Sequence, residues 1–276
     1  MKLSLTCTTN GASYMKQDGF LTLPNSDGEA RQYAVTPGIR MALALRDTVL
    51  NAEENRIGMI VGDPGTGKTV ASKAIVHTTP GAMRIVGHPR MDAKSILKAI
   101  YDACGVQDAK GTTSNLMQNA MTSGLVKNKL IVLDEANQLL AKPFEVLRLL
   151  SDEAGAAVIC IGTLLFRRYM VAEQATQLMK QFMSRVGPKS IDFRALTTDQ
   201  LAMYLIIPRF GKVNRDIASA WHHATGGNLR QATELAWSVE RVMKANNIPT
   251  ITAEAVQAAI ADLGTTVAAT AGLEKE

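Results

Sequence analysis

The sequence predicts an α/β protein in which helices flank a parallel sheet and a smaller helical domain follows. Short apolar runs alternate with helical patterns between residues 57 and 193, and this alternation is typical of parallel strands with helices on both faces. After Leu196 the pattern becomes wholly helical. We therefore expect an irregular N-terminal arm (1–35), an α/β domain (36–196), a helical lid domain (197–264) and a flexible tail (265–276).

Local patterns justify each element in turn. The arm is rich in glycine, serine, threonine and asparagine and shows little periodicity. A helical apolar pattern begins at Pro37 and ends near Asn51. The expected strands are 57–61, 82–86, 129–133, 156–161 and 190–193. One helix between them is expected to begin at Thr69. The others are expected near 92–104, 113–123, 143–153 and 172–185. Those of the lid lie near 198–206, 213–223, 228–245 and 252–262.

Composition is that of an ordinary globular protein. The chain has 276 residues, 46% of them hydrophobic and 20% charged, which is enough to bury a substantial core. It has no apolar run near the ~20 residues that cross a bilayer, and its N-terminus lacks the apolar stretch of a secretory signal. Cys7, Cys104 and Cys160 are far apart and in no metal-ligand spacing, so we expect reduced thiols. The expected location is the cytoplasm, without membrane contact.

The most specific motif occupies residues 62–69, between an apolar strand pattern and a helix pattern. It reads Gly62, Asp63, Pro64, Gly65, Thr66, Gly67, Lys68 and Thr69, and matches G-x-x-x-x-G-K-[ST] at every fixed position. The glycines let backbone N–H groups wrap a phosphate at the positive end of the following helix. Lys68 is then expected at the β- and γ-phosphates of ATP, and the Thr69 hydroxyl at Mg²⁺. The alternative is a glycine-rich turn with a surface lysine.

A second motif completes the expected nucleotide site. Four apolar residues, 130–133, are followed by Asp134 and Glu135. An acid at the end of an adjacent central strand holds the hydration shell of Mg²⁺, and the next carboxylate orients and deprotonates the attacking water. We assign Asp134 to the metal and Glu135 to the water.

Three further polar residues are candidates for sensing or stabilising the γ-phosphate. Thr163 follows the strand pattern 157–161, where it is either a helix cap or a sensor of the nucleotide. Arg185 follows Ser184 near the end of a helix, where it either reaches the nucleotide of a neighbouring subunit or makes a surface or intrachain contact. Arg230 lies in the first turn of a lid helix, a place that the helix dipole disfavours for a cation, so we prefer a nucleotide-sensing role over a solvated one.

In this order the motifs resemble those of the AAA+ ATPases, and within them those of the MuB/TnsC-type transposition ATPases of phages and transposons. The resemblance covers about residues 33–262. It is carried by the phosphate loop, by Asp134 and Glu135 with the helix that follows, by Ile161 and Gly162, and by the segment 182–186, which contains Arg185. It implies an ATP- and Mg²⁺-dependent ATPase that forms homo-oligomeric filaments on double-stranded DNA with little sequence preference. It also implies a partner transposase that receives the target DNA and stimulates hydrolysis, and a host-cell location if the gene is phage-borne.

A formal net charge of +5 and a pI near 9.1 permit nucleic-acid binding without demanding it. If DNA lies in the central channel of the ATPase assembly, basic side chains contact phosphates and binding is salt-sensitive and weakly specific. The DNA-binding candidates are Arg84, Arg90, Lys94 and Lys110, with Lys127 and Lys129 as alternatives. A solvated basic face is the competing interpretation.

Two other functions remain open from the sequence. One is an ATPase of the same class with a different client, as in helicase loaders or secretion ATPases. The other is a nucleotide-switched scaffold in which hydrolysis is incidental. A metabolic kinase is less favoured, because nothing in the sequence indicates a second substrate pocket.

Overall fold

The computed structural model describes residues 19–24, 28–172 and 176–273. Most of the expected arm, including Cys7, and residues 274–276 of the expected tail lie outside this part. No helix among the described residues has both the length and the apolar character needed to cross a membrane.

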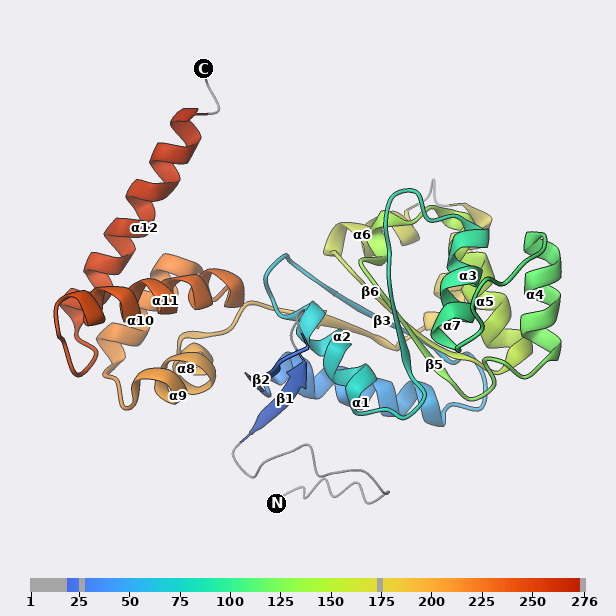
Figure 1. Ribbon diagram of the computed structural model, residues 1–276, viewed down its shortest axis with the longest axis horizontal. Helices are drawn as coiled ribbons and strands as arrows, with labels where there is room; N and C mark the ends of the chain where they lie inside the picture. The colour runs from blue at the N-terminus through green and yellow to red at the C-terminus, as the bar shows by residue number, and fades with distance from the viewer. Residues whose placement is uncertain (1–18, 25–27, 173–175, 274–276) are drawn as a thin grey trace.

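A five-stranded parallel sheet forms the centre of the first domain (Figure 1). Its strands are β3 (Ile57–Gly62), β4 (Met83–Val86), β5 (Leu130–Asp134), β6 (Ala157–Gly162) and β7 (Ser190–Phe193). The spatial order is β4-β5-β6-β3-β7. The expected parallel sheet is confirmed, and each strand begins and ends within one residue of its expected bounds.

Helices cover both faces of this sheet (Figure 1). On one face lie α1 (Pro37–Asn51) and α2 (Lys68–His77). On the other lie α3 (Ala93–Ala103), α4 (Thr113–Thr122), α5 (Ala141–Ala154), α6 (Leu164–Val171) and α7 (Gln177–Val186). The helix expected near 172–185 corresponds to α7, and the sequence analysis did not predict α6. Each begins after a threonine, Thr163 or Thr176, whose side chain accepts a backbone N–H bond of the first turn.

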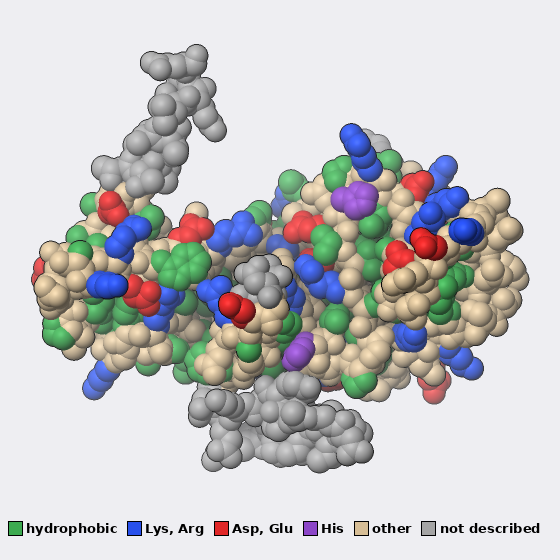
Figure 2. Space-filling model, in the orientation of Figure 1, with side chains coloured by type: hydrophobic (Ala, Val, Ile, Leu, Met, Phe, Trp, Pro, Cys, Tyr) green, Lys and Arg blue, Asp and Glu red, His purple; other side chains and the backbone are tan. Residues whose placement is uncertain are grey.

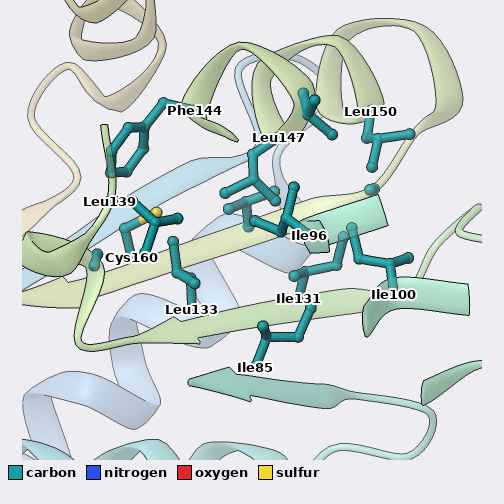
Figure 3. Close-up of a cluster of buried hydrophobic side chains, with 14 of the residues drawn as sticks. Ile85, Ile96, Ile100, Ile131, Leu133, Leu139, Phe144, Leu147, Leu150 and Cys160 are labelled. Carbon is teal, nitrogen blue, oxygen red and sulfur yellow. The ribbon is translucent and has the colours of Figure 1, made fainter. Parts of the chain in front are cut away.

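The strands are buried on both sides, as their continuous apolar runs require. Ile131 and Leu133 of β5 face the α5 side, whereas Leu130 and Val132 face the α2 side. Figure 3 shows α5 contributing Phe144, Leu147 and Leu150 to the core above the β5 side chains. This two-sided packing fixes the position of each strand end, where the polar motifs lie.

The expectation of an irregular arm is wrong for its described part. β1 (Phe20–Pro24) and β2 (Ala30–Ala34) pair as an antiparallel hairpin. Leu21 and Leu23 point to the same face and are fully buried against the α1 and α2 core. The alternation of two leucines over five residues was too short a signal to predict a strand.

The second domain is helical, as expected. Its elements are α8 (Thr198–Leu201), the π-helical turn η2 (Ala202–Ile206), α9 (Ile207–Phe210), α10 (Arg215–Thr225), α11 (Leu229–Ala245) and α12 (Ala253–Leu273). Trp221 is completely buried at its centre, and its Nε1 donates to the Ala232 carbonyl at 3.2 Å. α12 continues through residues 265–273 of the expected tail, and the flexibility of the tail stays a prediction. This stretch is rich in alanine and has no proline to end the helix.

Two cation–π contacts join the domains. The Arg31 guanidinium of β2 lies 5.9 Å from the ring of Trp237 in α11, and that of Arg40 in α1 lies 5.7 Å from the ring of Tyr204. Both connect the N-terminal part of the chain to the lid.

A close backbone contact at Gly227 also holds the lid to the linker from the sheet. The Leu196 N–H donates to the Gly227 carbonyl at 2.9 Å. Gly227 has a φ of +74°, and a Cβ placed there would lie 2.0 Å from the Leu196 carbonyl oxygen. Only glycine fits this position without moving the linker.

We expect Gly227→Ala to lower the free energy of unfolding of the lid by about 3 kcal/mol, through both steric overlap and backbone strain. Gly226→Ala is the matched control. Gly226 also has a positive φ, +57°, but a Cβ there meets no atom within 4 Å, so its cost should be about 1 kcal/mol. Urea unfolding followed by tryptophan fluorescence reports on this domain, since Trp221 and Trp237 both lie in it. Equal losses in the two variants would contradict the steric explanation.

Candidate nucleotide-binding site

The phosphate loop connects the buried strand β3 to the first residue of α2. Gly65 and Gly67 have φ values of +81° and +95°, which glycine adopts without strain. A Cβ on Gly62 would lie 2.6 Å from the Phe193 carbonyl oxygen, so β7 packs directly against the start of the loop. The Thr66 hydroxyl donates to the Asp63 carbonyl at 2.8 Å and closes the turn. The loop is therefore shaped by its backbone.

Lys68 lies inside this loop. Its Nζ donates to the Gly62 and Asp63 carbonyls at 2.8 and 2.7 Å. Partial burial lowers the pKa of Lys68 below its ordinary value, and nearby Glu135, Asp134 and Asp63 oppose that shift. The ammonium group is thus held by two backbone carbonyls, which an anionic phosphate would replace as its partner.

Asp134 ends β5 with its side chain almost completely buried. One carboxylate oxygen, Oδ1, accepts the Glu135 N–H at 3.1 Å. The other, Oδ2, accepts from Arg84 Nη2 at 2.6 Å and Arg84 Nε at 3.2 Å. Arg84 Nε also lies 2.6 Å from the Ser72 hydroxyl oxygen of α2. A buried carboxylate requires such partners, and the chain itself supplies them.

Arg84, one of the expected DNA-binding residues, is engaged within the protein. Arg84 lies within β4, and its partner Asp134 is on the neighbouring strand β5. In the register Arg84 is opposite Val132, so Asp134 is its diagonal neighbour on the same face of the sheet. The Arg84 guanidinium therefore lies beside Asp134, at the candidate nucleotide site.

Glu135 follows directly and is exposed. Its backbone is left-handed, with φ +54° and ψ +38°, a conformation uncommon for a residue other than glycine or asparagine. Such strain is concentrated at functional sites. The turn aims the Glu135 side chain away from the buried core that receives Asp134.

The residues fit a nucleotide-bound Mg²⁺ better than a free metal ion. Among the described residues, no group of three or more His, Cys, Asp or Glu side chains could hold a metal. Asp134 and the exposed Thr69, the second residue of α2, instead offer two hard oxygen ligands. Mg²⁺ commonly takes one or two protein oxygens and completes its shell with substrate phosphates and water.

Thr163 caps α6 in the structure. Its hydroxyl accepts the Phe166 N–H at 3.2 Å. It follows Gly162, which pairs with Val61 of β3, so Thr163 lies at the same end of the sheet as the phosphate loop. The cap interpretation is thus seen directly, and the sensor role stays a prediction. Nearby, the Asn137 Oδ1 atom is buried and has no hydrogen-bond partner.

The first turn of α11 contacts the phosphate loop. Asn228 Nδ2 donates to the Pro64 carbonyl at 2.8 Å, and the Arg230 N–H donates to the Gly65 carbonyl at 3.3 Å. Asn228 Oδ1 also accepts the Arg230 and Gln231 N–H groups and so caps α11. The exposed Arg230 is close enough to Lys68 to lower its pKa. The structure therefore brings Arg230 to the loop, as its expected role requires.

Arg185 lies in the last turn of α7 and makes the intrachain contact that was one of its alternatives. Its Nη2 lies 3.2 Å from Asp152 Oδ2 of α5, and Nη1 lies 3.1 Å from the Ser184 hydroxyl oxygen. Arg148 shares Asp152 at 2.7 Å. Arg185 remains one-third exposed, and its role toward a neighbouring subunit stays a prediction.

The other basic candidates do not share one element. Arg90 and Lys110 are exposed, in the loops before and after α3, whereas Lys94 is half-buried in its first turn. Of the alternatives, Lys127 is exposed and Lys129 Nζ lies 3.5 Å from the Cys104 sulfur. Figure 2 shows lysine and arginine side chains spread over both domains, with acidic ones between them. DNA contact by any of these residues stays a prediction.

Sequence reasoning missed two features of this site. It identified Asn228 as a helix cap but not as a contact to the phosphate loop, and it did not connect Ser72 and Arg84 with Asp134. The available signal for Arg84 was a charged residue inside the apolar strand 83–86. A charge in a buried strand requires an opposite charge nearby, and Asp134 also lies in a buried strand.

Comparison with known proteins places this site in a class. A family model described as an AAA domain matches residues 51–170. The chain is 27% identical over 144 residues to the Mu-like prophage FluMu DNA transposition protein B of Haemophilus influenzae. This match covers 49% of the chain and 48% of the relative, so the chain spans about half the length of the curated relative it matches.

Solved structures agree on the fold. The ORC2 protein of Aeropyrum pernix superposes with a TM-score of 0.58 at 15% identity, over 81% of this chain and 65% of that one. The DNA-bound Drosophila ORC gives a TM-score of 0.55 at 12% identity, over 92% and 70%.

The fold and the phosphate loop together define an AAA+ P-loop protein. The chain contains a parallel sheet, a strand-loop-helix phosphate site and a helical second domain. Within this class the chain is MuB-like. The resemblance expected from the motifs is thereby confirmed.

We expect Asn228→Asp to release the phosphate loop from the lid while keeping α11 capped, because a carboxylate accepts the two cap bonds but cannot donate to the Pro64 carbonyl. Amide hydrogen exchange should rise in residues 64–67 and stay unchanged in α11. Asn228→Ala is the control, since it should raise exchange in both segments and cost about 1 kcal/mol through loss of the cap. Unchanged loop exchange in Asn228→Asp would show that the contact does not hold the loop.

Proposed function

We propose that this protein is an ATPase that binds double-stranded DNA without sequence preference, forms filaments on it, and presents it as target DNA to a transposase. The observation that carries the proposal is the meeting of the phosphate loop, Asp134, Glu135 and the lid residue Arg230 at one end of the sheet. Similarity to a prophage DNA transposition protein B supports the client, and likeness to the DNA-bound Drosophila ORC is in keeping with DNA binding.

Each residue has a role that its position supports. The loop amides and Lys68 bind the nucleotide phosphates, and Thr69 and Asp134 hold Mg²⁺. The metal neutralises charge on the phosphates when bound. Glu135 is exposed at the strand end and orients the attacking water. Arg230, already beside the loop, senses the nucleotide from the lid.

The remaining part of the proposed ATPase site comes from an adjacent subunit. Arg185 is one-third exposed and pairs with Asp152 and Ser184. We propose that it reaches the nucleotide of an adjacent subunit, where an arginine stabilises transition-state charge. Nucleotide binding then favours assembly, and basic side chains of the assembled subunits contact DNA phosphates.

The central test is co-sedimentation of the protein with random-sequence duplex DNA, with and without ATP at low salt. We expect ATP-dependent binding by the wild-type protein and none by Lys68→Ala, which loses the phosphate contact. Glu135→Gln should bind DNA but hydrolyse ATP at least about 100-fold more slowly, because it keeps the fold of the site without the base. Electron microscopy of the same samples shows whether filaments surround the DNA.

The results separate this function from the others. Binding to single strands in preference to duplex would favour a helicase-loader type of client. DNA assemblies that turn over equally fast in Glu135→Gln and wild type would favour a scaffold. Absence of duplex binding at low salt would refute the proposal.

Subunit mixing tests the role of Arg185. Lys68→Ala cannot bind nucleotide but keeps Arg185. Arg185→Ala binds nucleotide but lacks the arginine. Each variant alone should therefore be nearly inactive. If the two residues act across an interface, the mixture regains part of the wild-type ATPase rate, because an intact site forms between unlike subunits. The double variant Lys68→Ala/Arg185→Ala is the control, because it supplies neither an intact nucleotide site nor Arg185 and should not complement Arg185→Ala. A mixture no more active than its components would place Arg185 outside the site.

A further inference from the structure

The carboxylate of Asp134, the proposed metal residue, is fully engaged by the protein itself. Its side chain is 3% exposed. Oδ1 accepts the Glu135 N–H, and Oδ2 accepts both Arg84 nitrogens. Oδ2, the oxygen that a metal hydration shell would use, is therefore already paired with a cation.

Arg84 is the cation that pairs with Asp134 in the described part of the chain. Lys68 is also nearby, but its Nζ bonds go to the Gly62 and Asp63 carbonyls. Arg84 has a second anchor, because its Nε lies 2.6 Å from the Ser72 hydroxyl oxygen on α2. The Arg84 side chain is 26% exposed, whereas that of Asp134 is 3% exposed.

A guanidinium and a divalent cation compete at such a place. Two like charges near one carboxylate repel strongly in a partly buried site. Removal of Arg84 without replacement would leave a buried carboxylate uncompensated, which is also unfavourable. The two cations can therefore alternate at Asp134, because either one alone compensates the charge of the buried carboxylate.

We propose that Arg84 is an internal counter-ion of the metal site, which holds Asp134 in the metal-free protein and gives up or shares Oδ2 when Mg²⁺ binds with nucleotide. This rests on the proposed nucleotide site and adds a regulatory residue to it. Arg84 raises the Mg²⁺ concentration that the site requires, and it keeps the empty site folded. It is a positioning residue, because it acts through Asp134.

The test follows Mg²⁺-dependent binding of a fluorescent, non-hydrolysable ATP analogue, so the readout is independent of hydrolysis. Arg84→Gln removes the charge but keeps a donor for Asp134. We expect it to lower the Mg²⁺ concentration for half-maximal binding about tenfold, which corresponds to about 1.4 kcal/mol. Arg84→Lys keeps the charge and should stay within about twofold of wild type.

The matched control is Arg167→Gln. Arg167 of α6 pairs with Asp192 of β7, another strand-end ion pair of the same domain, and both side chains are about one-third exposed. Its loss should leave the Mg²⁺ requirement unchanged. An unchanged or higher Mg²⁺ requirement in Arg84→Gln, or equal shifts in Arg84→Gln and Arg84→Lys, would overturn the proposal. Absence of Mg²⁺-dependent binding by the wild-type protein would refute the proposed function instead.

A measurement on the wild-type protein keeps the inference testable if Arg84→Gln does not fold. The ¹⁵Nε resonance of Arg84, assigned by comparison with Arg84→Lys, reports on its bonds to Ser72 and Asp134. Addition of Mg²⁺ with the same analogue should shift this resonance, whereas the Arg167 resonance should remain in place. No shift of the Arg84 resonance, in a sample where the analogue binds, would show that Arg84 does not respond to the metal.

Discussion

Parallel pairing of β3, β5 and β6 is the constraint on which the site depends. Because the three strands run in the same direction, their carboxyl ends lie at one edge of the sheet. Gly62, Asp134 and Thr163 lie at or directly after these ends, although 101 residues separate the first from the last (163 − 62). Any slip in register would separate the phosphate loop from its acids, and close packing of the strand side chains against helices on both faces opposes such a slip.

Much of this arrangement could be predicted from the sequence, for physical reasons. The β3 and β6 segments are buried at every residue, so their apolar runs are continuous and easily recognised. The phosphate loop is specified by backbone conformation, which its glycines reveal directly. The hairpin β1–β2 was missed because Leu21 and Leu23 are stabilised by distant helices, and that information is absent from five residues of local pattern.

The partners of charged groups were less predictable than the strands. Arg84 was assigned to DNA because a basic residue near a loop has no partner in a one-dimensional sequence. Its partner, Asp134, is 50 residues away and becomes a neighbour only through the β4–β5 register. The same holds for Asn228, which contacts Pro64 across 164 residues. Hydrogen bonds between domains depend on the final packing, and periodicity carries no information about it.

The left-handed backbone of Glu135 has a consequence for the evolution of this protein. Glycine at this position would adopt the observed φ of +54° without strain, and asparagine would tolerate it better than glutamate. Selection for stability alone therefore favours loss of the carboxylate at position 135. If Glu135 orients the attacking water as proposed, stability and turnover are in opposition at a single backbone torsion, and a laboratory search for heat-resistant variants would be drawn toward inactive ones.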